Sequence, residues 1–240
     1  MPANAILPPD ATPDATPDVA GTIAQRTIAK REAHYTDEVR RLLDAALGVM
    51  RDCGTASSPR VADIVAAAGL SNDAFYRHFA SKEALVAAIL EDGSVRLASY
   101  LRHQMAKESS PEAQVRRWVD GVMAQAGDES VAATTRAVLW NGGRLSERVS
   151  TDRPSAAASL ATLLHEPFAA LGSRDPAADA VLAAHAAVGL LSDLLWQRAR
   201  PTRAQVDHML AFCLTAVTGA APARRPGGDQ TRSTRRPKSD

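Results

Sequence analysis

The residue that most constrains the fold of this chain is Gly69, which separates two short segments with helical spacing. The apolar side chains of the first segment, residues 60–68, recur three and four positions apart, at Val61, Ile64, Val65 and Ala68. This spacing predicts a short amphipathic helix. A glycine directly after it predicts the left-handed turn that often ends a helix, because glycine adopts that conformation at little steric cost.

The second segment, Asn72–Phe79, is also predicted to be a short helix. Ser71 is expected to cap its first turn, where Asp73 adds a favourable negative charge. Phe75 and Phe79 lie four residues apart on a face that we expect to be buried. Two helices joined by a glycine turn, the second short and polar on its outer face, predict a helix-turn-helix. The second helix of that motif enters the major groove of DNA.

A lysine at the start of the next helix adds to this interpretation. Ser81 is predicted to cap that helix, so Lys82 takes its first position, where a cation opposes the helix dipole at a cost of up to about 1 kcal/mol. A DNA phosphate bound there would reverse the effect, since the N–H groups of a helix start also bind anions. Two interpretations are open. A solvated lysine is favoured for Lys82 alone, and a phosphate contact is favoured by its place after the helix-turn-helix.

The same stretch carries a family motif. Residues 75–85 read Phe-Tyr-Arg-His-Phe-Ala-Ser-Lys-Glu-Ala-Leu and follow Ala-Gly-Leu-Ser at 68–71. This region, about Thr36 to Leu90, resembles the DNA-binding domain of the TetR family of bacterial transcriptional regulators. The resemblance implies a three-helix head followed by a helical ligand-binding and dimerisation body. We expect the first helix of the head to be capped by Thr36 and to end at Gly54.

The expected DNA contacts lie on the second helix and beside it. Base-edge contacts are predicted for its first, exposed residues, Asn72, Asp73 and Ala74. The resemblance implies phosphate contacts at the positions of Tyr76, His78 and Lys82, and Arg60 is a further phosphate candidate. With the capping serine, the predicted DNA-binding set is Arg60, Ser71, Asn72, Asp73, Ala74, Tyr76, His78 and Lys82.

Two members of this set have a second interpretation. The family often has an uncharged residue at the position of Asp73, and phosphates repel a carboxylate, so Asp73 can instead serve only as a helix cap. The imidazole of His78 can instead pack beside Phe79 as part of the core. The family pattern favours the phosphate contact for His78.

Composition predicts an all-α protein. The chain has 240 residues, of which 45% are hydrophobic but only 4% aromatic, and alanine supplies much of the apolar total. Alanine-rich and arginine-rich segments of this kind favour helices. The formal net charge of +1 neither supports nor excludes DNA binding, because a DNA-binding protein needs a basic face rather than a basic total.

Four regions are expected along the chain. Residues 1–35 are predicted to be a disordered extension whose basic arm contains Arg26, Lys30 and Arg31; these residues can alternatively form a solvated linker, which is favoured, or extend the first helix. Residues 36–82 are the predicted DNA-binding domain and residues 83–219 the ligand-binding and dimerisation domain. Residues 220–240 are predicted to be a disordered basic tail.

The larger domain is expected to provide a ligand pocket and a dimer interface. Helices from about Ser81 to Arg198 would enclose a small, largely apolar inducer. Its candidate lining residues, each of which is individually more typical of a core, are Tyr100, Trp118, Met123, Trp140, His165, Phe168 and His185. The last two helices, about 176–217, are expected to pair with a second copy through small residues. Those residues, which alternatively form a core within one subunit, are Ala183, Ala184, Ala186, Ala187 and Gly189.

Several classes of function are not expected. The sequence has no Walker loop, dinucleotide-binding Gly-x-Gly-x-x-Gly, His-Glu-x-x-His or Gly-x-Ser-x-Gly motif, so an enzyme is not predicted. No cofactor, metal or membrane segment is predicted, and two cysteines without metal-ligand spacing are typical of a reducing cytoplasm.

These patterns together predict a cytoplasmic, nucleoid-associated homodimer. It would repress transcription from a palindromic operator and be released by a small molecule. The alternative hypothesis is an all-helical small-molecule-binding protein or enzyme whose head has lost its DNA-binding function.

Overall fold

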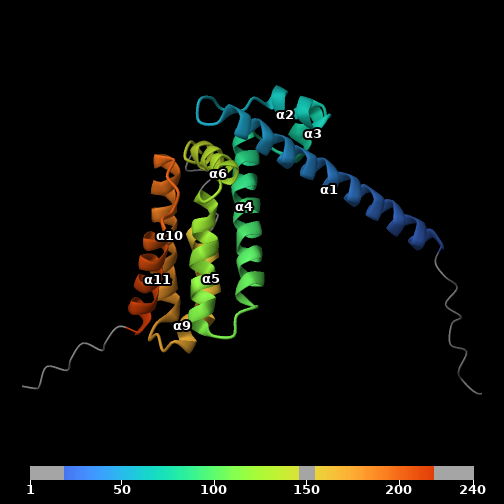
Figure 1. The fold of residues 1–240 in the computed structure, drawn as a ribbon. Helices are drawn as coiled ribbons and strands as arrows, with labels where there is room; N and C mark the ends of the chain where they lie inside the picture. Colours follow the sequence, from blue (N-terminus) through green and yellow to red (C-terminus); the bar gives the residue numbers. More distant parts are fainter. Residues whose placement is uncertain (1–18, 146–154, 219–240) are drawn as a thin grey trace, which may run out of the picture. The chain divides into compact units, whose positions relative to one another are not determined.

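The computed structural model describes residues 19–145 and 155–218, and all regular elements in these ranges are helical (Figure 1). The prediction of an all-α fold is therefore confirmed. The chain divides into two compact units. Unit 1 contains the described residues up to Ile89 and a short stretch from Ala137, and unit 2 contains Leu90–Arg136 and the described residues from 155 onward.

Unit 1 is built on helix α1 (Val19–Cys53), against which α2 (Val61–Ala68) and α3 (Asn72–His78) pack. Figure 1 shows both short helices beside the C-terminal half of α1. The first residues of α4 (Lys82–Met105) complete this unit. Its fully buried core residues come from all four helices and are Leu42, Ala46, Met50, Ile64, Phe75 and Leu85. The apolar spacing of the sequence thus predicted the packing of this unit.

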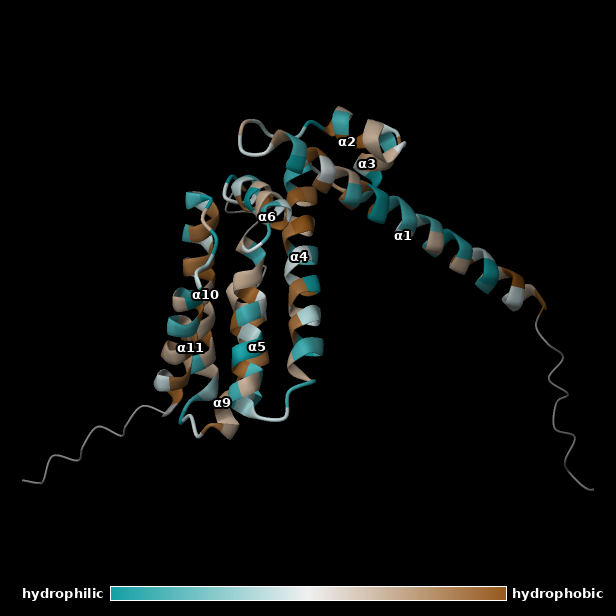
Figure 2. Ribbon diagram, viewed as in Figure 1, coloured by the Kyte–Doolittle hydropathy of each residue, from teal (hydrophilic) through white to brown (hydrophobic). Residues whose placement is uncertain are grey.

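Helix α1 begins well before the predicted position. It starts at Val19 rather than at Thr36, whose hydroxyl donates to the carbonyl of Glu32 within the helix and does not cap it. Residues 22–37 of α1 are exposed, and Figure 2 shows this stretch in mostly hydrophilic colours. Buried positions begin only at Glu38. The helix therefore continues through residues that have good helix propensity but no partner to pack against, which is why apolar periodicity did not reveal them.

Unit 2 is a bundle that contains most of α4, α5 (Pro111–Met123), η1 (Ala124–Ala126) and the first half of α6 (Glu129–Gly142). The second described range, residues 155–218, adds five helical segments: α8 (Ala156–Ala161), η2 (Thr162–Leu164), α9 (His165–Ala170), α10 (Pro176–Gln197) and α11 (Arg203–Thr218). Helix α10 contacts α5, α8, α9 and α11, and Figure 1 shows α5, α10 and α11 side by side.

Small and large apolar residues share the core of unit 2. Ala180, Ala184 and Ala187 on α10 are fully buried, so neighbouring helices approach its backbone closely. Trp118 on α5 is also fully buried, and its indole N–H donates to the carbonyl of Leu160. By length and composition α10 could cross a membrane, but the central helix of a soluble bundle has the same properties.

The compact units do not divide the chain at the predicted residue, because the boundary in α4 lies after Ile89 and not after Lys82. The functional assignment of residues 36–82 and 83–219 stays a prediction. The predicted disorder of residues 1–18 and 220–240 lies outside the described residues. The sequence also predicts a charged loop at Arg144–Arg153, and most of it lies outside the described residues as well.

Candidate nucleic-acid interface and ligand pocket

The turn between α2 and α3 has the geometry that its glycine predicted. Gly69 has φ 62° and ψ 38°, and its N–H donates to the carbonyl of Ala66 while the N–H of Leu70 donates to that of Val65. This pair of hydrogen bonds is the Schellman motif, which satisfies carbonyl groups left free at a helix end. The turn that orients α3 is therefore fixed by backbone chemistry.

Arg41 of α1 holds the same turn from the other side. Its Nε and one terminal nitrogen donate to the carbonyl of Ala68, at 3.1 and 2.5 Å, and that terminal nitrogen also donates to the carbonyl of Gly69. A cation is favourable at the negative end of α2. The positive φ favours glycine, and a methyl group added at Gly69 would lie 3.1 Å from the Arg41 guanidinium, which would have to shift by a few tenths of an ångström.

Helix α3 turns one face inward and leaves the other free. Ser71 caps it by accepting from the N–H of Ala74, and Phe75 is fully buried. Asn72, Asp73 and Tyr76 are exposed, and Tyr76 is 58% accessible. The predicted capping role of Ser71 is therefore confirmed, and polar side chains occupy the free face at the start of the helix.

A buried carboxylate anchors the other end of α3. Glu38 of α1 is only 5% exposed, and it accepts hydrogen bonds from Arg77 at 2.9 and 3.0 Å. It also lies 2.7 Å from Nε2 of His78. The hydrogen bond from His78, followed by that from Arg77, holds the pKa of the Glu38 carboxyl below its usual value, although burial acts in the opposite direction. Glu38 and Arg41, three residues apart on α1, thus fix both helices of the motif.

Two predicted DNA contacts are revised by this geometry. Ala74 is 5% exposed and faces the core, so it does not lie on the free face with Asn72. The His78 side chain is 8% exposed and paired with Glu38, which supports the internal role rather than the phosphate contact. Sequence reasoning missed Glu38 because it placed this residue in the first turn of a helix. An acidic residue among the apolar stripe positions of α1 was the available signal.

The two flanking cations differ in their surroundings. Arg60, just before α2, donates to Asp63 at 2.9 Å, and this contact raises the pKa of the guanidinium above its usual value. Lys82 is the first residue of α4, and Ser81 accepts from the N–H of Ala84 as the predicted cap. Within the described part of the chain Lys82 forms no ion pair. Lys82 is therefore the cation that remains available at a helix start beside α3.

Comparison with protein families decides the identity of this region. The family described as bacterial regulatory proteins, tetR family, matches residues 42–89, which span the end of α1, the helix-turn-helix and the start of α4. Residues 42–89 therefore carry the DNA-binding domain of tetR-family bacterial regulatory proteins, as the resemblance implied. No curated protein sequence matches this chain.

Solved structures of TetR-family regulators share the fold. The fatty acid degradation regulator FadR from Bacillus halodurans is 18% identical with a TM-score of 0.57, and the match covers 74% of this chain and 94% of that one. FadR from Bacillus subtilis, solved in complex with stearoyl-CoA, is 14% identical with a TM-score of 0.54 and coverage of 76% and 99%. A TetR-family structure from Mesorhizobium loti is 16% identical with a TM-score of 0.57 and coverage of 76% and 96%.

The predicted pocket residues have different surroundings, and their assignment to one pocket stays a prediction. Trp118, Met123 and Phe168 are buried core residues, which agrees with the core interpretation weighed for each of them, because dense packing uses large apolar side chains. Trp140 is only partly buried. Tyr100 and His185 are exposed, and His185 bonds to the carbonyl of Val181 on its own helix.

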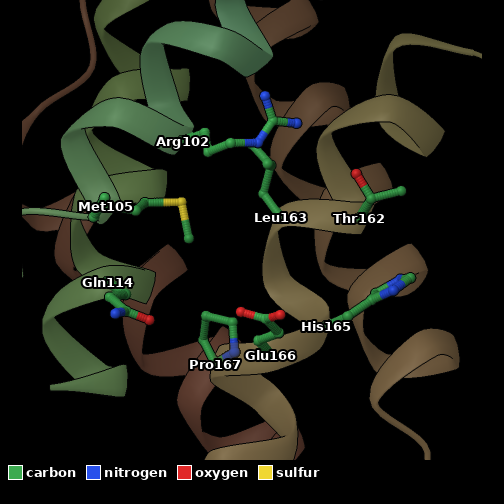
Figure 3. A pocket seen from close by; sticks show the side chains of 9 residues that line it. Arg102, Met105, Gln114, Thr162, Leu163, His165, Glu166 and Pro167 are labelled. Carbon is green, nitrogen blue, oxygen red and sulfur yellow. The ribbon is translucent and has the colours of Figure 1, made fainter.

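A pocket of about 560 Å³ does exist in unit 2, and its lining includes His165 from the predicted set. It lies between the end of α4, the start of α5 and the η2–α9 segment. Its lining comprises Arg102, Met105, Ala106, Gln114, Thr162, Leu163, His165, Glu166 and Pro167. Figure 3 shows Arg102 and Glu166 at opposite ends, with Met105 and Leu163 between them. The lining carries both charges, which does not fit the largely apolar inducer that we expected.

Proposed function

We propose that this protein is a homodimeric, ligand-responsive repressor of the bacterial cytoplasm that binds a palindromic operator through α3. The observation that carries this proposal is the arrangement of α3. Its inner face is buried and anchored at both ends by α1, while Asn72, Asp73 and Tyr76 remain free. A short helix held in this way has the properties of a recognition helix, which must be rigid to read base edges.

Asn72 is the strongest candidate for base recognition, because an amide pairs with adenine in the major groove. Tyr76 and Lys82 are the proposed phosphate contacts, and Lys82 would be joined by the N–H groups at the start of α4. Asp73 lies in the first turn of α3, where its charge favours the helix, so it contacts a base only at a cytosine amino group. To contact DNA, the Arg60 guanidinium must give up its ion pair with Asp63 and bind a phosphate instead.

The basic residues Arg26, Lys30 and Arg31 lie on the exposed part of α1. A helix with side chains is about 10–12 Å wide and does not enter a minor groove about 6 Å wide. If these residues contact DNA, they therefore do so at the phosphates. Replacing all three with alanine should then reduce the salt dependence of DNA binding without changing sequence preference.

A second copy is the proposed partner of α10 and α11. Val181, Leu182, Gly189 and Trp196 are exposed and fall within an arc of about 100° on α10, at 3.6 residues per turn. The opposite face is buried within the subunit. His185 is the polar residue exposed within this arc, and the rest of the arc named here is apolar. A helix that is buried on one face and largely apolar on the other normally has both faces covered. The alanines at 183, 184 and 187 are not part of this surface, because they are buried within one subunit.

The dimer is tested by charge placed on this face. Leu182→Glu should give a monomer in sedimentation equilibrium and lose binding to a palindromic site, because one recognition helix reads too few bases. Val95→Glu is the matched control, since Val95 is a comparably exposed apolar residue on α4 (59% against 65%). A dimeric Leu182→Glu protein would exclude α10 as the interface.

Ligand control would pass along α4, which carries Lys82 at its start and the pocket residues Arg102 and Met105 at its end. A ligand releases DNA only if it binds the DNA-free state more tightly than the DNA-bound state. A change in the position of α4 would alter the separation of the two recognition helices, which must match successive turns of the DNA.

DNA binding is tested with the double variant Tyr76→Ala/Lys82→Ala on fragments of the protein's own promoter. The expected result is a folded dimer that has lost sequence-specific binding in fluorescence anisotropy. Tyr100→Ala/Lys107→Ala is the matched control, because it removes an exposed tyrosine and an exposed lysine from unit 2. Equal DNA binding by both variants would contradict the proposal and favour a protein whose head does not bind DNA.

A further inference from the structure

The pocket at the end of α4 contains two charges of opposite sign that do not pair. Arg102 comes from the last turn of α4 and Glu166 from α9. Neither forms an ion pair or hydrogen bond with any described residue. Other charged side chains of unit 2 do find partners, for example Arg116 with Asp207 at 3.2 Å and Arg117 with Glu108. Both residues are exposed, so the pocket holds a solvated guanidinium and a solvated carboxylate that no described residue pairs with.

The surface between these charges is apolar. Met105 is 6% exposed, Pro167 is buried and Leu163 is partly buried, and all three line the pocket. Figure 3 shows Met105 and Leu163 between the Arg102 end and the Glu166 end. A ligand that spans the pocket would thus meet a cation, an apolar wall and an anion in sequence.

The charge pattern discriminates between ligand classes. Arg102 attracts a simple anion and Glu166 repels it, whereas Glu166 attracts a simple cation and Arg102 repels it. For either ion the attraction and the repulsion largely cancel. A molecule with one negative and one positive end is attracted at both. The volume of about 560 Å³ lies within the range of small-molecule pockets.

We propose that this pocket binds a small zwitterion, with its anionic group at Arg102, its cationic group at Glu166 and an aliphatic middle against Met105 and Leu163. This inference rests on the proposed function, since it names the class of ligand to which the regulator responds. Gln114 and Thr162 line the same pocket and add neutral hydrogen-bonding groups for a ligand with polar substituents.

The test uses 8-aminooctanoate as the zwitterion, with octanoate and octylamine as probes that each lack one charge. Binding is followed in the full-length protein through the ¹³C-methyl NMR signals of methionine. Met105 lies in the pocket, and Met50, buried in unit 1, is the internal control. Met105→Leu assigns the reporter signal. A series from 4-aminobutanoate to 12-aminododecanoate finds the charge separation that fits best.

The expected result is a saturable shift of the Met105 signal, with 8-aminooctanoate or another member of the series binding several-fold more tightly than either single-charge probe. Exposed ion pairs contribute up to about 1 kcal/mol, which is about fivefold for each charge. Arg102→Gln should remove the advantage over octylamine and leave that over octanoate. Glu166→Gln should do the opposite. The charge exchange Arg102→Glu/Glu166→Arg should keep the preference for zwitterions.

Two results would overturn the inference. One is octanoate or octylamine binding as tightly as the best zwitterion, and the other is no shift at Met105 with any probe at the limit of solubility. DNA binding is measured on the same preparation without probe. A protein that binds its operator but ignores zwitterions contradicts this inference alone, and one that binds zwitterions but no DNA contradicts the proposed function alone.

Discussion

Different kinds of contact stabilise the inside of each of the two units. In unit 1, α1 reaches both helices of the helix-turn-helix with charged side chains: Arg41 binds the carbonyls of the turn, and Glu38 binds Arg77 and His78. In unit 2, the central helix α10 is packed mainly through alanine and leucine, and fewer polar contacts add to this packing: Trp118 donates to the carbonyl of Leu160, and Arg136 donates to that of Leu195.

This difference follows from the size and the role of each unit. The buried end of α1, two short helices and the start of α4 bury a limited apolar area, so packing alone defines the position of a seven-residue helix weakly. Charge-assisted hydrogen bonds are directional and add that definition. A larger bundle has enough apolar area to fold by packing, and it can leave polar groups such as Arg102 and Glu166 free for other uses.

The largest loss of stability is expected from a substitution that disrupts the packing of unit 2. Trp118→Ala removes a fully buried side chain and the indole hydrogen bond to the Leu160 carbonyl, so we expect a loss of about 3–5 kcal/mol in the free energy of unfolding. Urea unfolding followed by circular dichroism measures it. Trp118→Phe keeps most of the volume and should lose only about 1–3 kcal/mol. Equal losses for the two variants would show that packing is not the main contribution.

The next test removes the charge that organises unit 1. Glu38→Gln should be less stable than the native protein at neutral pH and should lose DNA affinity, because Arg77 and His78 lose their partner. The folded protein holds the pKa of Glu38 below its usual 4.5, so the stabilisation is present above that pH and is lost as the pH falls through the lower, folded value.

The stability of the native protein should therefore decrease more steeply with falling pH than that of Glu38→Gln. Thermal unfolding between pH 3 and 7 measures both slopes. Asp37→Asn, which changes a neighbouring exposed carboxylate, is the control and should keep the native slope. The same slope in Glu38→Gln would show that this carboxylate does not govern the acid response.

A third test compares Gly69, whose backbone is left-handed, with a glycine inside a helix. Gly69 ends α2 in unit 1, and Gly69→Ala should cost about 1–2 kcal/mol from the backbone, with a further loss if Arg41 is displaced. Gly48→Ala is the matched control in the same unit, because Gly48 lies within α1 with open space around it, and it should be neutral or stabilising. Chemical denaturation measures the change in the free energy of unfolding for each variant. We expect a decrease for Gly69→Ala and no decrease for Gly48→Ala.

The smallest effect is expected at the corresponding turn of unit 2. Arg198 ends α10 with φ 53°, in the same region of backbone space but without glycine. Arg198→Gly should stabilise the protein by about 0.5–1 kcal/mol, since relief of the steric cost exceeds the entropy cost of glycine. A measured loss of stability would mean that the Arg198 side chain contributes more than its backbone strain costs.

The sequence predicted unit 1 more closely than unit 2. The spacing of Val61 to Ala68, Gly69 and the capping serines gave the helix-turn-helix nearly residue by residue. It did not show that Ala74 faces inward or that His78 pairs with Glu38, because those facts depend on the angle at which α3 meets α1. The pocket prediction relied on residue size, but Trp118 and Phe168 proved to be core residues, Tyr100 is exposed and Trp140 is only partly buried.

The sequence by itself determined local features, namely the helical spacing of apolar residues, a turn that needs glycine, the helix caps and the family motif. Each of these depends on residues within one or two helical turns of one another, so the order of residues along the chain is sufficient. Only the tertiary structure decided that Glu38 and Arg41 of α1 hold the motif and that Arg102 and Glu166 remain unpaired across one pocket. These residues are brought together, or kept apart, by the packing of helices that are distant in the chain, which local spacing does not encode.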